Sequence, residues 1–298
     1  MHDRFAKGNT PDRGAEGNLN RRTFVGTLSA AAVMGRLGWA ADAHRIEKIG
    51  LELYTVRDAL KKDFEGTLSR VAKIGYKEVE FAGYFADLKN FNPAPKKTRE
   101  LLTSLGLDAP ATHIPYSAVM PENLPRVIEA SEIIGHKYIV NPGIDEALRN
   151  TADGWKKAAE AFNRAGKETA RSGIQFAYHN HVIEFKPVDG QLPYDILLKE
   201  CDPKLVKMEM DLGWAHEAGT DPLKWWAEYP GRFPLVHVKD FEANGTMTDV
   251  GKGVIDWKAL FAKADLGGVK HYFMEFDDPK SPFESVEASY EYLEKLRF

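Results

Sequence analysis

Four side chains that can bind metals or carry protons each follow a short apolar run in the second half of the chain. They are His179 in "AYHNH", Asp211 in "KMEMDLG", His237 in "LVHVKD" and Glu275 in "YFMEFDD". Successive members lie 32, 26 and 38 residues apart, and each interval is long enough for one strand and one helix. Two imidazoles and two carboxylates form a mixed donor set, which suits a divalent ion such as Mn²⁺, Co²⁺, Fe²⁺, Zn²⁺ or Ni²⁺.

Three of these residues also have structural explanations that need no metal. Asp211 stands where a side chain can cap a following helix, and Glu275 can form an ion pair with Lys239. His237 lies between two valines, so its alternative role is that of a core histidine bonded to the backbone.

The stretch "QFAYHNHVIEF" (175–185) ends an apolar run in two imidazoles separated by an amide. Side chains of a strand alternate between its faces, so His179 and His181 point to one side and Asn180 points to the other. Either imidazole can therefore be the ligand from this strand, and a structural histidine pair is the alternative.

Three residues are candidate proton carriers: Lys239, His181 and Glu80. Lys239 follows His237 by two positions and shares its face, so its ammonium can remove a proton or stabilise an oxyanion. Glu80 is an acid inside an apolar strand, and its alternative role is an inward ion pair in the barrel floor or with Arg57.

Three further residues are candidates for substrate binding. His113 ends an apolar run and is expected on the same rim as the ligand set. Tyr54 and Trp214 are aromatic residues near that rim and can stack on a sugar, although core packing also explains such residues.

Eight apolar runs alternate with helical patterns and must position these side chains. The runs are 48–55, 76–83, 107–114, 136–143, 174–181, 205–213, 233–240 and 271–278. Strands that alternate with helices pair in parallel through right-handed crossovers. Eight units in about 250 residues predict a single (β/α)₈ TIM barrel over 44–298, with its active groups at the carboxyl ends of the strands. The alternative, an open doubly wound sheet, usually has a glycine-rich phosphate loop after its first strand, and "LYTVRD" has none.

The helical patterns between the runs have recognisable faces and ends. "RDALKKDFEGTLSRVAKIG" (57–75) places five apolar residues on one stripe and ends in a glycine. "TADGWKKAAEAFNRAGKETARSG" (151–173) repeats this pattern with Gly173 as its stop, and Pro282 is expected near the start of the last helix.

Residues 1–43 differ from the rest of the chain. Arg21 and Arg22 precede a modest apolar stretch that is too short to span a bilayer, and an Ala-Asp-Ala triplet (41–43) fits a cleavage site. This segment resembles a bacterial twin-arginine export signal, and the alternative is a short helix packed on the domain. We therefore expect recognition by the twin-arginine export machinery, cleavage after Ala43 and a periplasmic protein.

Composition excludes several classes of function. The 298 residues carry a net charge of −4, and basic residues do not cluster after residue 44, so a nucleic-acid surface is not expected. The single cysteine, Cys201, excludes an intramolecular disulfide and a cysteine-based zinc cluster, and no stable membrane anchor is expected.

From residue 46 onward the chain resembles the sugar phosphate isomerase/epimerase family, which has a xylose isomerase-like TIM barrel. The matching stretches are "GLELYTVRD", "VEFAGY", "AYHNH", "DLGWAHEAGTDP", "YPGRFPLVHVKDF", "GKGVIDW" and "MEFD". The resemblance implies a carbohydrate substrate and a divalent ion (Mn, Co, Zn, Fe, Ni or Mg). It also implies that the ion is held by four side chains at the ends of strands five to eight, which here are His179, Asp211, His237 and Glu275.

The sequence departs from this family at two positions. The family usually has Glu where this chain has His179, which removes one negative charge beside the metal and makes the ion a stronger Lewis acid. Trp214 stands where related epimerases often have a histidine. Those epimerases use two glutamates as acid and base, and with His179 in the place of a glutamate this pair is incomplete here.

Three functions follow from this site. The first is a metal-dependent sugar isomerase or epimerase that works through a metal-stabilised enediolate. The second is a lyase or dehydratase that cleaves a keto-sugar or 3-keto-glycoside by β-elimination. The third is a sugar-binding barrel without catalytic activity.

Overall fold

The computed structural model describes residues 44–84, 87 and 91–298. The predicted export signal (1–43) lies outside the described residues. Among the residues that are described, no helix is long and apolar enough to cross a membrane.

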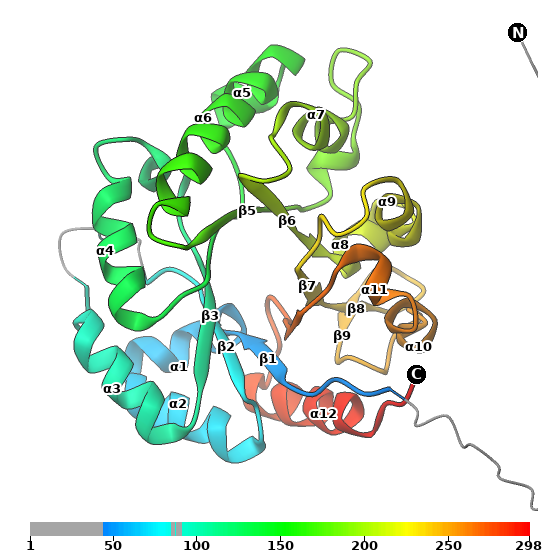
Figure 1. Ribbon diagram of the computed structural model, residues 1–298. Helices are drawn as coiled ribbons and strands as arrows, with labels where there is room; N and C mark the ends of the chain where they lie inside the picture. The colour runs from blue at the N-terminus through cyan, green and yellow to red at the C-terminus, as the bar shows by residue number, and fades with distance from the viewer. Residues whose placement is uncertain (1–43, 85–86, 88–90) are drawn as a thin grey trace, which may run out of the picture. The chain divides into compact units, whose positions relative to one another are not determined.

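Eight parallel strands form a closed barrel, which confirms the predicted TIM-barrel fold (Figure 1). The strands are β1 (Ile49–Glu52), β2 (Glu78–Phe81), β3 (Asp108–His113), β4 (Tyr138–Asn141), β5 (Gln175–His179), β6 (Val206–Asp211), β7 (Leu235–Val238) and β10 (His271–Met274). Each strand lies within one of the eight predicted runs, and β1 pairs with β10 to close the barrel. The carboxyl ends of all eight strands therefore meet at one rim.

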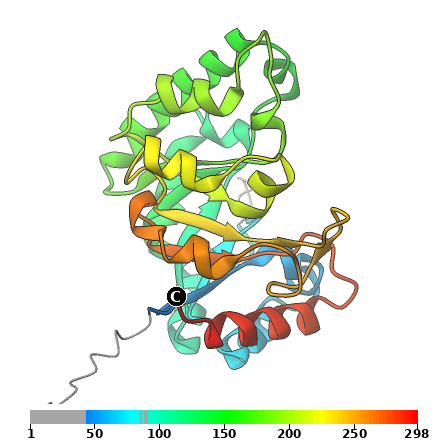
Figure 2. The same cartoon turned by 90° about the vertical axis from the view of Figure 1, so that its right-hand side faces the viewer.

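Helices surround the barrel on its outer side (Figures 1 and 2). They are α1 (Arg57–Lys62), α2 (Phe64–Ile74), α3 (Pro95–Leu105), α4 (Leu124–Ile134), α5 (Glu146–Arg149), α6 (Ala152–Ala170), α7 (Pro193–Glu200), α8 (Leu212–Glu217), α9 (Pro222–Glu228), α10 (Trp257–Phe261), α11 (Ala264–Gly267) and α12 (Pro282–Lys295). Short 3₁₀ turns cover Leu53–Val56, Tyr116–Val119 and Ile183–Phe185. As predicted, Pro282 begins α12, and Gly173 follows α6 with a positive φ of 68°.

The helical pattern over 57–75 forms two helices rather than one. Asp63 separates α1 from α2 with an extended backbone, and its side chain accepts a hydrogen bond from Gly66 N–H. This is a helix N-cap, which satisfies a free amide of the first turn and favours a new helix start over continuation. Leu68 and Val71 keep the predicted buried face of α2.

Alternation along the strands divides the core into two parts. Side chains on the outer face, such as Phe176 and Tyr178, pack beneath the helices in the larger apolar cluster. Small and apolar side chains on the inner face fill the barrel interior; these are Ala111, Val140, Ala177, Leu235 and Phe273. The next inward positions toward the carboxyl ends carry His113, His179 and His237. These apolar side chains of the barrel interior therefore lie directly beneath the polar side chains of the rim.

A small hairpin follows β7 outside the barrel. It pairs β8 (Asp240–Phe241) with β9 (Met247–Thr248) in antiparallel fashion. The buried Asp240 carboxylate accepts hydrogen bonds from Phe241, Gly251, Gly253 and Ile255 N–H and from Trp257 Nε1. One side chain thus fixes both the start of the hairpin and the "GKGVIDW" segment after it. In Figure 2 the hairpin and the segment before α12 extend on the same side of the barrel.

Candidate functional site

Strand register brings three of the four predicted ligands together. Asp211 at the end of β6 pairs with His237 on β7, and Glu275 directly follows β10, the other neighbour of β7. Ligand atoms of Asp211, His237 and Glu275 all lie within 4.8 Å of one another, and all three residues are buried.

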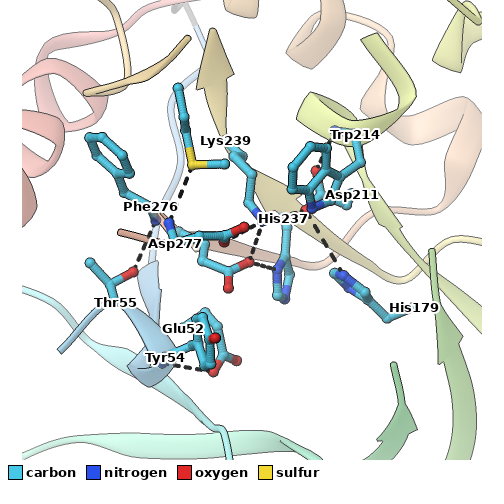
Figure 3. Close-up of polar contacts among 12 residues, drawn as sticks. Glu52, Tyr54, Thr55, His179, Asp211, Trp214, His237, Lys239, Phe276 and Asp277 are labelled. Atoms are coloured by element: carbon cyan, nitrogen blue, oxygen red, sulfur yellow. Dashed lines mark hydrogen bonds and ion pairs between the residues drawn. The ribbon is translucent and has the colours of Figure 1, made fainter. Parts of the chain in front are cut away.

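His179 lies at the edge of this group. Its Nε2 atom is 3.9 Å from Asp211 Oδ2 (Figure 3). Its Nδ1 atom is 3.1 Å from Glu209 Oε2. If Nδ1–H donates to Glu209, the lone pair of Nε2 points toward Asp211, which is the arrangement that a metal-binding imidazole needs.

Glu209 is a further candidate site residue that was not predicted from the sequence. Its fully buried Oε2 atom lies 2.7 Å from His113 Nε2, 3.1 Å from His179 Nδ1 and 3.2 Å from His237 Nε2. One carboxylate oxygen therefore contacts three imidazoles and can orient them. The available signal was spacing, because Glu209 precedes Asp211 by two residues and so shares its inward face.

His237 is held between carboxylates on both sides. Its Nδ1 atom is 2.7 Å from Glu275 Oε2, and its Nε2 atom is 2.8 Å from Glu80 Oε2. Burial lowers the pKa of His237, but the charges of Glu209 and Glu275 outweigh burial and raise it well above its usual value. Binding of a metal ion by this imidazole would therefore require the loss of one of its ring protons.

Lys239 neutralises the carboxylates of the rim. Its Nζ atom lies 3.1 Å from Asp211 Oδ2, 3.0 Å from Glu275 Oε2 and 2.8 Å from Asp277 Oδ1. Burial lowers the pKa of Lys239, but Asp211, Glu275 and Asp277 together raise it above its ordinary value. The ammonium thus occupies space between two candidate metal ligands and offsets their charge.

The donor set fits a divalent ion. Asp211 Oδ1 caps α8 by accepting from Trp214 N–H at 2.8 Å, while its buried Oδ2 atom forms the ion pair with Lys239 but accepts no regular hydrogen bond from the described residues. The helix-cap explanation and the ligand explanation for Asp211 therefore hold together. A second group of donor atoms within 4.8 Å of one another comprises His113, His179, Glu209 and His237. We favour the set that contains Asp211, His237 and Glu275, because Glu275 lines a pocket whereas Glu209 does not; His179 lines the pocket too and is close enough to serve either set.

The pocket at the rim has a volume of about 400 Å³. Its lining residues are Tyr54, Ala82, Gly83, His113, Ile114, Pro115, Pro142, His179, His181, Lys239, Glu275 and Asp277. Six predicted site residues thus meet in one cavity: Tyr54, His113, His179, His181, Lys239 and Glu275. The sequence analysis missed Asp277, which follows the predicted ligand Glu275 by two residues.

Four predicted site residues do not line this pocket, namely the candidate ligands Asp211 and His237 described above, and Glu80 and Trp214. Glu80 is fully buried beneath His113 and His237, and burial followed by the charge of Glu209 raises the pKa of Glu80 to about 8. It pairs with His237 rather than with Arg57, which contacts Asp278. The ring of Trp214 lies against Lys239, with its centroid 4.9 Å from the ammonium nitrogen.

Buried hydrogen bonds fix the backbone of the "HNH" triplet on both sides of Asn180. Asn180 is fully buried, and its side chain exchanges hydrogen bonds with the backbone of Asp211, which ties the end of β5 to the end of β6. Glu184 accepts from His181 N–H at 2.8 Å and from Tyr178 Oη at 2.5 Å, which closes the following turn. His181 therefore enters the pocket on a fixed backbone. Burial, with a contribution from Lys239, lowers its pKa to about 4.

The chain is similar to two solved structures over most of its length. A sugar phosphate isomerase/epimerase from Parabacteroides distasonis is 31% identical with a TM-score of 0.74, and the match covers 85% of this chain and 95% of that chain. A second protein of the same description and organism is 26% identical with a TM-score of 0.71, covering 84% and 98%.

Curated relatives match over a shorter region. An inosose dehydratase from Geobacillus thermodenitrificans is 28% identical over 174 residues, which is 51% of this chain and 58% of that protein. The chain thus spans somewhat more than half the length of this relative.

A family model described as a xylose isomerase-like TIM barrel matches residues 68–296. That range contains all four predicted metal ligands and every strand from β2 to β10. The chain belongs to the xylose isomerase-like TIM barrel proteins and, within them, to the sugar phosphate isomerase/epimerase family.

Proposed function

We propose that this protein is a divalent-metal-dependent lyase that cleaves a keto-sugar by β-elimination. The observation that carries the proposal is the presence of a base and an acid in one pocket. His181, whose pKa is lowered to about 4, is a neutral base near pH 7, and Asp277 lies in the same pocket. Burial, followed by the charge of Glu275, raises the pKa of Asp277 to about 6. Near pH 7 about one Asp277 carboxyl group in ten therefore carries a proton, and a pKa this close to the working pH lets the group pass a proton in either direction.

The residues at the rim divide into metal-holding and proton-moving groups. His179, Asp211, His237 and Glu275 would hold the ion, and Glu209 would orient the two imidazoles. The ion supplies Lewis acidity that polarises the ketone of the substrate. The Lys239 ammonium lies beside the ligand carboxylates, where it can stabilise negative charge on the ketone oxygen.

Proton transfer completes the elimination. His181 removes the proton from the carbon next to the ketone, and the C–H electron pair moves toward the carbonyl. Those electrons then form a carbon–carbon double bond as the bond to the β-oxygen breaks. Asp277, or Lys239 bonded to it at 2.8 Å, gives a proton to the leaving oxygen. The products are an unsaturated keto-sugar and an alcohol or water.

The dehydratase names of the curated relatives agree with this reaction type. Elimination is also consistent with the position of Glu80, which does not reach the pocket. An epimerase needs two proton carriers on opposite faces of one carbon, and one of the predicted carriers is thereby removed from the rim.

The second candidate is a sugar isomerase or epimerase that uses the same metal and enediolate. It is favoured by the likeness to the two Parabacteroides distasonis proteins over more than four fifths of this chain. A sugar-binding barrel without turnover is the third.

One assay separates the three candidate functions, and a sugar-binding barrel without turnover is the case that gives neither nitrophenol nor deuterium incorporation. The purified protein, loaded in turn with Mn²⁺, Co²⁺ or Zn²⁺, is incubated in D₂O with a nitrophenyl 3-keto-glucoside. A lyase releases nitrophenol and an unsaturated keto-sugar, which mass spectrometry distinguishes from a hydrolysis product. An isomerase or epimerase incorporates deuterium without release of nitrophenol, and this result would overturn the lyase proposal. His181→Ala is the matched variant and is expected to lose turnover while it retains the metal.

We also propose that residues 1–43 are a cleaved twin-arginine signal. Its support is the Arg21-Arg22 pair followed by an apolar stretch and the Ala-Asp-Ala triplet. Fractionation of a bacterial host tests this proposal. The expected product is a periplasmic protein that begins at His44, and replacement of both arginines by lysine should abolish export. Periplasmic protein that still begins at Met1, or export that survives the replacement, would contradict it.

A further inference from the structure

We infer that a groove beside the catalytic pocket binds a second sugar ring, so that the substrate is a keto-glycoside whose leaving group is a neutral sugar. This inference rests on the proposed lyase function, because it assigns the leaving-group side of the same reaction. The groove has a volume of about 840 Å³, roughly twice that of the pocket.

The groove lies between two segments that are distant in sequence. One wall is the end of the β8–β9 hairpin with Met247 and Thr248, and the other is the segment that leads into α12. Asp277 N–H donates to Met247 Sδ at 3.2 Å, so the two walls are joined at their base. Figure 3 shows this contact beside Lys239.

Asp277 lines both the groove and the catalytic pocket. Lys239, which also lines the pocket, bonds Asp277 and lies against the ring of Trp214, and Trp214 lines the groove. Asp277 therefore stands at the boundary between the two spaces. A substrate with one sugar ring in the pocket can extend past Asp277 into the groove.

Size indicates a substrate of two parts. Ligand pockets in proteins commonly have volumes of about 300–1,000 Å³, and the catalytic pocket lies near the lower end of that range. It suits a single sugar ring. The adjacent groove has room for another ring without any change in the residues that hold the metal.

Charge and chemistry select a neutral sugar for the groove. Its lining contains four carboxylates against two ammonium groups, which are Asp249, Asp277, Asp278 and Glu284 against Lys252 and Lys280. This balance disfavours a phosphate or another anionic group. Carboxylate acceptors with the aromatic rings of Trp214 and Phe276 suit a polyhydroxylated ring.

Two substrates that differ only in the leaving group test the inference. One is a 3-keto derivative of a β-linked glucose disaccharide, and the other is methyl 3-keto-β-glucoside. The disaccharide derivative is expected to have at least a tenfold higher kcat/KM in the wild type. Ala288→Phe, on the groove side of α12, should abolish this preference and change kcat/KM of the methyl glycoside less than twofold. Ser281→Trp fills the groove from another position, and its result replaces that of Ala288→Phe if the latter does not fold.

The control is Glu287→Phe, which places the same ring at the neighbouring exposed position of α12 outside the groove. It should leave the preference intact. Equal kcat/KM values for the two substrates in the wild type, or a parallel loss for both in the groove variants, would overturn the inference.

A binding measurement separates failure of the groove from failure of the proposed reaction. Calorimetry compares a β-linked glucose disaccharide with methyl β-glucoside, neither of which has the reactive ketone. The groove predicts tighter binding of the disaccharide by at least tenfold, with the difference lost in Ala288→Phe. Absence of turnover with this preference present rejects the reaction alone, whereas absence of the preference rejects the groove.

Discussion

Glu209 Oε2 lies 3.1 Å from His179 Nδ1, one residue pair across the β5–β6 register. This contact selects the His179 tautomer that leaves Nε2 free toward Asp211. Glu209→Gln preserves the shape but replaces a charged acceptor by an amide that must place a donor among the same imidazoles. Removal of such an orienting carboxylate typically costs about 10–100-fold in metal affinity. We expect that loss in a competition titration with a chelator.

Glu78 provides a matched control for the Glu209 variant. It is also a buried carboxylate bonded to a histidine, with Oε2 2.8 Å from His271 Nδ1, but it lies at the start of β2 and not at the rim. Glu78→Gln should leave metal affinity within threefold. Equal effects of the two variants would show that Glu209 acts only through general stability.

His179 and His181 are expected to have separable roles. His179→Ala should reduce metal affinity at least tenfold, because its Nε2 faces Asp211. His181→Ala should retain the metal within threefold and lose at least 100-fold in turnover, the usual contribution of a general base. Metal content by plasma mass spectrometry and steady-state kinetics measure both. Full metal retention in His179→Ala would remove it from the ligand set.

Lys239→Met is expected to lower the stability of the metal-free protein and to increase the stabilisation that an added metal ion gives. Without the ammonium, the buried carboxylates of Asp211 and Glu275 lose their counter-charge. Breaking a buried pair in this way costs about 3–5 kcal/mol, so the Tm of the metal-free protein should fall on the order of 10 °C. A metal ion no longer competes with the ammonium, so the rise in Tm on metal addition should be larger than in the wild type. Thermal unfolding with and without a chelator measures both effects. A rise in Tm on metal addition that is smaller than in the wild type would contradict the assignment of Asp211 and Glu275 as ligands.

His136 should make the fold sensitive to mild acid independently of the metal site. Burial lowers the pKa of His136 to about 3. Between pH 3 and 6.5 the unfolded chain binds a proton here that the folded protein does not, so stability falls as pH decreases. From pH 7 to pH 5 this group alone removes about 2 kcal/mol of unfolding free energy.

His136→Gln removes that contribution and should flatten the pH dependence by the same amount in denaturant titrations. The exposed His44 supplies the control, because His44→Gln should leave the slope unchanged. An unchanged slope in His136→Gln would show that this imidazole is solvated or charged in the folded state.

The barrel and the position of the rim were predictable from the sequence because they follow from alternation alone. An apolar run long enough for a strand, followed by Asp211 or Glu275, places an acid at the carboxyl end whatever the rest of the chain does. The same reasoning placed His113, His181 and Lys239 in the pocket. Their roles remain predictions.

Partners across strands were harder to predict, because they depend on register. Of the two pairings expected for Glu80, the inward pair inside the barrel is found, with His237 from β7 as the partner, whereas Arg57 pairs with Asp278. Glu209 was missed because an acid within "KMEMD" reads as part of the strand until β5 and β7 set imidazoles beside it. The helix break at Asp63 was missed because a capping side chain competes with an uninterrupted apolar stripe.

The Asp240 carboxylate anchors the β8–β9 hairpin beside the end of β7, which carries His237. It lies three residues after His237 and holds the chain on both sides of the hairpin through Phe241 and Gly251. The exposed tip at 243–245 lies between these anchors. Its length and sequence can therefore vary while the strand ends stay in place. The groove-lining residues Thr246 to Asp249 lie between the same anchors, so we expect leaving-group specificity to change by replacement of this one insert.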